Sequence, residues 1–174
     1  MKLFTQPNSC PKEKTPLRQW ICLAGLGVVR FVGKWALSPL ANIEPVSLLI
    51  IVIATIFGWK ALASVYIYVF LEIVFYGFGI WNAMYLYVWV ILLVAIMLTR
   101  HFANPILNAV ISGFFGLFFG VFCSIPYFIT AGVGGGLAWI ISGIPYDLIH
   151  CVANFFLALF CSAPLINSLK KVIK

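Results

Sequence analysis

The chain has 174 residues, of which 64% are hydrophobic and only 9% are charged, and its formal net charge is +7. A water-soluble domain carries roughly 25% charged residues, so this much apolar surface cannot be hidden in one water-soluble core. In lipid the backbone must satisfy its own hydrogen bonds, which leaves helices or closed barrels. Residues 47–57 and 88–98 are apolar without the alternation of a barrel strand. The sequence therefore predicts an all-α integral membrane protein.

Polar breaks divide the chain into apolar segments, several of them close to the about 20 residues that cross a bilayer. We predict six transmembrane helices, at residues 19–40, 46–57, 61–75, 84–99, 105–129 and 145–165. The breaks include Gly58-Trp59-Lys60 and a glycine run at 132–136. Residues 1–18 are basic and interrupted by proline, so we expect a disordered cytoplasmic tail before a single six-helix domain, residues 19–171.

The distribution of basic residues sets the expected orientation. With six spans and a cytoplasmic N-terminus, every Lys and Arg outside the spans faces the cytoplasm: Lys2, Lys12, Lys14, Arg18, Lys60, Arg100, Lys170, Lys171 and Lys174. One long helix over 46–75 would instead place Lys60 near the middle of the bilayer, at a cost of about 2.5–3.5 kcal/mol. We therefore expect both termini in the cytoplasm and a location in the plasma membrane. Topology accounts for the positive charge, and no nucleic-acid partner is expected.

The other ionisable residues of the predicted helices concentrate in the outer half of the membrane. They are Arg30, Lys34, Glu72, Asp147 and His150, with Glu44 in the first outer loop. Charges at this depth are expensive and mark a water-filled or substrate-lined cavity by default. Structural roles stay open: Arg30 and Lys34 could pair with Glu72 to hold helices together. Asp147, just after Pro145, could complement the dipole at the start of the last helix.

Helical spacing favours a shared cavity. Asp147, His150 and Asn154 recur on one face of the last helix, and Trp81 and Tyr85 form an aromatic stripe beside Asn82. We expect these faces to line an outer site for one small organic molecule. The predicted substrate-binding residues are Arg30, Lys34, Glu72, Trp81, Asn82, Tyr85, Asp147, His150 and Asn154. One histidine beside one carboxylate is too few ligands for a metal, and no cofactor is expected.

Two further sequence features bear on packing and on catalysis. Gly116 and Gly120 form a G-x-x-x-G pattern, which permits close helix approach and predicts helix packing. The chain has no nucleophile elbow, zinc-protease motif or phosphate-binding loop. We therefore expect that the protein is not an enzyme and does not hydrolyse ATP itself.

Residues 143–150 read Gly-Ile-Pro-Tyr-Asp-Leu-Ile-His, with Asn154 one turn later. This segment resembles the start of the last helix in the S components of energy-coupling factor (ECF) vitamin transporters. The chain's size, its six predicted spans and its short 42–46 loop extend the resemblance to residues 19–171. The resemblance implies a high-affinity subunit that binds a vitamin-like substrate near the outer face. It also implies a transmembrane coupling subunit and two ATP-binding subunits as partners. Two alternatives remain: a stand-alone carrier or channel for a small solute, and a membrane assembly scaffold.

Overall fold

The computed structural model describes residues 17–40, 42–102 and 104–173, and in this part of the chain the protein consists of helices joined by turns and loops, with no strand. The all-α prediction is confirmed. The elements are α1 (Leu17–Ala36), α2 (Val46–Phe57), η1 (Gly58–Lys60), α3 (Ala61–Tyr76), α4 (Ile80–Thr99), η2 (Arg100–Phe102), α5 (Pro105–Leu117), α6 (Phe119–Cys123) and α7 (Ile125–Ile173). Helix α1 begins two residues earlier than predicted, and the rest of the expected disordered tail, residues 1–16, lies outside the described residues.

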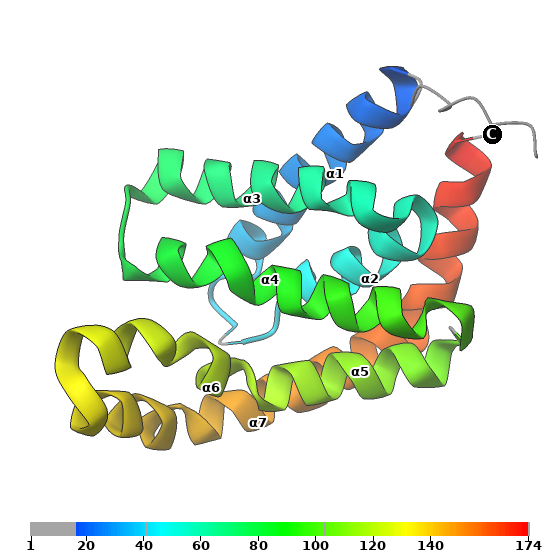
Figure 1. Cartoon of the computed structure of the whole chain (residues 1–174). Coiled ribbons are helices and arrows are strands. Elements are labelled where there is room, and N and C mark those ends of the chain that lie inside the picture. The colour runs from blue at the N-terminus through cyan, green and yellow to red at the C-terminus, as the bar shows by residue number, and fades with distance from the viewer. Residues whose placement is uncertain (1–16, 41, 103, 174) are drawn as a thin grey trace, which may run out of the picture.

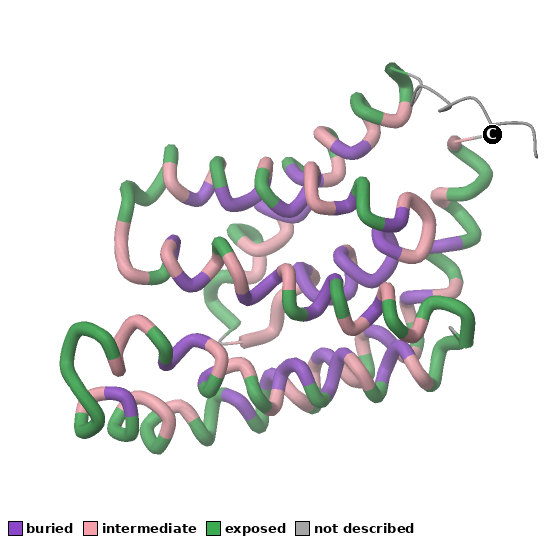
Figure 2. Tube along the Cα trace, viewed as in Figure 1, coloured by how far each residue is buried: buried purple, intermediate pink, exposed green. Residues whose placement is uncertain are grey.

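Among the described residues, three helical stretches are long and apolar enough to cross a membrane: Val46–Tyr76, Ile80–Phe102 and Ile125–Ile173. Helix α1, which carries three basic residues, is not among them, and α5 is a shorter apolar helix. Large apolar side chains such as Phe70 and Leu98 are exposed on the outside of the bundle, 63% and 76% respectively. Figure 2 shows the buried positions on the sides of the helices that face one another. These features are compatible with lipid as the surrounding solvent.

The stretch from Val46 to Tyr76 is broken at Gly58, where the backbone adopts a φ of 61°. This left-handed conformation is costly for any residue with a side chain and readily adopted by glycine. The 3-10 turn η1 follows, and Figure 1 shows α3 running back from this turn. Helices α2 and α3 are therefore separate, and residues from both, including Ile50 and Val65, pack in one core.

Helix α7 contains a second reversal, at Gly132, where φ is 68°. The rings of Tyr127 and Trp139, on either side of it, stack with centroids 4.1 Å apart and planes 18° apart. Figure 1 shows residues 125–131 beside the beginning of the helix that follows Gly132, in a hairpin, while the rest of that helix runs on to the other end of the bundle. The prediction that the last helix begins at Pro145 is wrong: the helix already follows Gly132, and Pro145 lies inside it. A proline removes one backbone hydrogen bond, a loss that helices packed among neighbours tolerate.

The fourth helix also begins earlier than predicted, at Ile80 rather than at Met84. Its N-cap is Gly79, whose backbone N–H donates to the side-chain oxygen of Asn82 over 2.7 Å. This bond satisfies one of the backbone groups that every helix start leaves unpaired. Trp81 and Asn82 therefore belong to the first turn of α4 and not to a loop.

The described basic segments lie together at one end of the bundle. The Arg18 guanidinium donates a hydrogen bond to the Val172 carbonyl, which joins the start of α1 to the end of α7. Leu48, Val52 and Ile56 along α2 cluster with Ile166 and Leu169 near the end of α7. A Cβ placed on Gly58 would lie 3.0 Å from Nη1 of Arg100, so η1 and η2 are neighbours. Lys60, Lys170 and Lys171 belong to these same segments.

Helices α5 and α7 approach closely enough for their backbones to touch. A Cβ on Gly116 would lie 2.7 Å from the carbonyl oxygen of His150, closer than real Cβ contacts. A Cβ on Gly113 would lie 3.3 Å from Cβ of Phe155. Gly120 faces the side chain of Asp147, which occupies the space of a Cβ. Small residues along this side of α5 and α6 therefore set the distance to α7.

Replacing Gly116 tests this contact. Gly116→Ala forces α5 away from the α7 backbone, and we expect a loss of about 1–3 kcal/mol, or roughly 2–10 °C in Tm. Gly25→Ala is the matched control, because a Cβ there meets nothing within 4 Å. Thermal unfolding of both purified variants in detergent measures the difference. Equal Tm values for the two variants would contradict the close contact.

Candidate functional site

Three cavities lie at the end of the bundle away from the basic segments, and Tyr85 lines all of them. Their volumes are about 360, 290 and 290 Å³. The end of α1, the loop between α1 and α2, and the starts of α4 and α6 contribute to their walls, together with the middle of α7. The first cavity shares Trp81 with the second, and the second shares Lys34 with the third.

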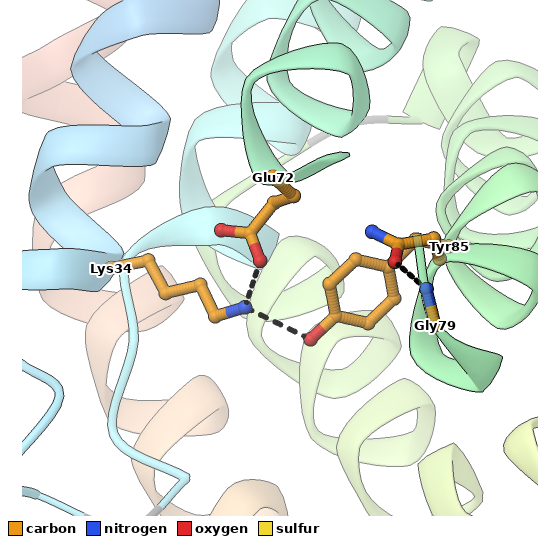
Figure 3. Close-up of polar contacts among 5 residues, drawn as sticks. Lys34, Glu72, Gly79 and Tyr85 are labelled. Atoms are coloured by element: carbon orange, nitrogen blue, oxygen red, sulfur yellow. Dashed lines mark hydrogen bonds and ion pairs between the residues drawn. The ribbon is translucent and has the colours of Figure 1, made fainter. Parts of the chain in front are cut away.

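Lys34 is held by two partners at the centre of this region. Its Nζ lies 2.8 Å from Oε2 of Glu72 in a salt bridge and donates to the Tyr85 hydroxyl over 3.1 Å. Figure 3 shows the lysine reaching from α1 between these two side chains. The ammonium also lies 4.7 Å from the centre of the Tyr85 ring, within range of a cation–π interaction. The pair links α1 to α3, and both of its members line the second cavity.

Arg30 does not line any of these three cavities. It lies one helical turn before Lys34 and is fully buried. Its Nη2 donates to the Ser64 hydroxyl over 2.9 Å, and the guanidinium carbon lies 5.8 Å from the centre of the Tyr68 ring. Arg30 was predicted to bind substrate; the structure places it in the packing between α1 and α3, outside the walls of these three cavities.

Asp147 points from α7 toward the short helix α6. Its carboxylate oxygens accept the backbone N–H of Gly120 at 3.0 and 3.1 Å. The alternative role of complementing the start of its own helix is excluded, because that helix begins well before Pro145. The carboxylate instead lies at the first turn of α6, where backbone N–H groups have no acceptor within the helix itself. Asp147 also lines the first of the three cavities, and its side chain is 7% exposed.

The remaining predicted residues divide into cavity-lining and packed groups. Trp81 is 55% exposed and separates the first two cavities, and Asn82 lines the second. His150 lines the third cavity, with its ring edge-on to Phe119 at 4.8 Å. Asn154 lines none of the three: it is buried and donates to the Ser47 hydroxyl over 3.2 Å.

The sequence analysis did not predict several residues that line the first cavity. Phe119 on α6 and Trp139 and Tyr146 on α7 line it, and the Asn42 side chain closes over it by donating to the Tyr146 carbonyl at 2.9 Å. Trp139 lies eight residues before Asp147, a helical spacing, and Tyr146 is the residue next to Asp147, so part of the pattern was present in the sequence. The prediction that the last helix begins at Pro145 left Trp139 outside that helix.

Glu44 lies in the loop between α1 and α2 and lines the third cavity with Lys34. Burial raises the pKa of Glu44 to about 7, although the nearby Lys34 ammonium acts in the opposite direction. The charge of this carboxylate therefore changes near neutral pH.

The arrangement suits binding of a small organic molecule, with rings for stacking and a few polar groups for orientation. Among the described residues, no group of three or more His, Cys, Asp or Glu side chains is placed to hold a metal ion. No protein-family model, curated protein or solved structure matches the chain.

The salt bridge provides a test of the site's architecture. Glu72→Gln leaves the Lys34 ammonium partly buried without a counter-ion, and we expect a loss of about 1–3 kcal/mol, below the cost of breaking a fully buried pair. Adding Lys34→Met should restore part of the loss, with a coupling energy of about 1 kcal/mol or more in a double-mutant cycle. Thermal unfolding measures all three variants, and Lys60→Met, at an exposed lysine, is the control. If the effects of the two substitutions on the free energy of unfolding are additive, the salt bridge contributes nothing to stability.

Proposed function

We propose that this chain is the membrane-embedded substrate-binding subunit of an importer, of the S-component type found in ECF transporters. It binds a small, vitamin-like organic molecule from outside the cell. The observation that carries the proposal is the group of cavities around Tyr85, confined to one end of the bundle and lined by aromatic and charged side chains. The segment that carries the family resemblance contributes Gly143, Tyr146 and Asp147 to the largest of them.

The middle of the bundle favours a binding subunit over a channel. Fully buried apolar side chains of α2 and α4 fill it, among them Ile50, Ile51, Leu92 and Leu93. A solute in the cavities meets the close-packed apolar side chains of these two helices beneath them. Release toward the cytoplasm then requires a conformational change. We propose that a coupling subunit and two ATP-binding subunits drive it, since the chain has no phosphate-binding loop.

We further propose six membrane crossings with both termini in the cytoplasm. The gathering of Arg18, Lys60, Arg100 and the C-terminal lysines at one end supports this orientation. Helix α2 is about 18 Å long, short of the about 30 Å hydrocarbon core. It is nevertheless buried on most sides by other helices, so its ends need not reach the lipid surface.

Accessibility labelling tests the topology. In a cysteine-free background, Lys60→Cys and Phe78→Cys place single thiols in η1 and in the exposed turn between α3 and α4. An impermeant thiol reagent added to intact cells should label position 78 and leave position 60 unlabelled until the membrane is opened. Labelling of both from outside would contradict six crossings.

Native mass spectrometry of the purified protein tests the binding function. We expect a co-purifying small molecule at one per chain, and Trp81→Ala should lower its affinity about tenfold by removing a cavity wall. Trp59→Ala is the matched control, because Trp59 is 54% exposed, close to the 55% of Trp81, but lies in η1.

The isolated protein in liposomes should bind this molecule without concentrating it. Accumulation driven by an ion gradient alone would contradict a dependence on ATP-hydrolysing partners. Equal loss of ligand in the two tryptophan variants would contradict the location of the site.

A further inference from the structure

We infer that the ligand of the first of the three cavities around Tyr85, the one that Asp147 lines, is an organic cation, with Asp147 as its counter-ion and aromatic rings around it. The inference rests on the proposed function and names the substrate class of that site. We call this cavity the aromatic cavity, after the residues that distinguish it: Trp81, Tyr85, Phe119, Trp139, Tyr146 and Asp147.

The first argument is the charge of the cavity wall. Asp147 is the one lining residue with a charged side chain, and the remaining lining residues are aromatic, apolar or neutral polar. It forms no salt bridge with any Lys, Arg or His in the described part of the chain, where it accepts hydrogen bonds from the backbone of Gly120. A carboxylate that is 7% exposed and lacks an opposite charge is costly. A positively charged ligand supplies the missing partner.

The second argument is that neither of the nearby basic side chains, Lys34 and Arg30, lines this cavity. The Lys34 ammonium is neutralised by Glu72 at 2.8 Å in the neighbouring cavity. Arg30, which would balance a further acid if it faced the site, is buried against Ser64 and Tyr68 instead. The aromatic cavity is therefore left with one negative charge, which attracts a cation and repels an anion.

The third argument is the aromatic wall. Ring faces carry negative potential and attract cations within about 6 Å. Tyr85 also offers a hydroxyl oxygen to cations: the Lys34 ammonium donates to it over 3.1 Å and lies 4.7 Å from the ring centre. Trp139 is fixed by its stack on Tyr127 at 4.1 Å, which holds its ring in the wall. The volume of about 360 Å³ suits one small ring-bearing molecule.

The test uses three ring compounds of nearly one shape and different charge: 1-methylnicotinamide (+1), 3-methylbenzamide (neutral) and 3-methylbenzoate (−1). Isothermal titration calorimetry of the full chain in detergent, after removal of any co-purified molecule, measures each affinity. We expect the cation to bind about tenfold or more tightly than the neutral amide, and the anion to bind most weakly. This order is measured on the unmodified protein, so it does not depend on a variant that folds.

Asp147→Asn removes the charge and keeps an oxygen for the Gly120 N–H. It should bring the affinity of the cation down to that of the neutral amide and leave the neutral amide within about twofold. Glu44→Gln is the control, because it removes a carboxylate that lines the third cavity but not the aromatic cavity. Its effect on the preference for the cation should be smaller.

Each contrary result has its own meaning. Equal or tighter binding of the neutral or anionic compound overturns the inference and leaves the proposed binding function standing. A preference for the cation that survives in Asp147→Asn overturns the role of this carboxylate. If none of the three compounds binds up to about 10 mM, the inference is also overturned, and the co-purification experiment decides on the proposed function separately.

Discussion

The contact between the backbones of α5 and α7 at Gly116 is the constraint on which the candidate site depends. Because Gly116 has no side chain, the carbonyl of His150 approaches to a distance that a Cβ would not allow. One turn later, the same close spacing brings the N–H of Gly120 within 3.0 Å of Asp147. The carboxylate is thereby fixed between α6 and α7, and the rings of both helices line one cavity.

Two buried carboxylates of the site face different surroundings. Glu72 is paired with Lys34, and this bond links two helices at the price of leaving neither charge available. Asp147 is held by a backbone N–H, which orients it without neutralising it. The first carboxylate therefore stabilises the walls, while the second remains open to a partner from outside the chain.

The candidate site was only partly readable from the sequence. Helical spacing grouped Asp147 with His150, and in the structure Asp147 lines the first cavity whereas His150 lines the third. It could not distinguish Lys34, which faces a cavity, from Arg30, one turn away on the same helix and buried in packing. Asn154 likewise continues the face of His150 but meets Ser47 on α2. Spacing fixes the face of a helix, whereas the neighbour that covers each turn depends on the fold.

Composition by itself determined an all-α chain compatible with a membrane, because unbroken apolar runs leave helices as the means of satisfying the backbone. Glycine also marked reversals, at Gly58 and Gly132, where φ is positive. The tertiary structure alone decided that the last helix continues from after Gly132 through Pro145, which placed Trp139 in the same cavity wall as Tyr146 and Asp147. The physical reason is that packing against neighbouring helices outweighs the single hydrogen bond that a proline removes, and no local sequence pattern records that balance.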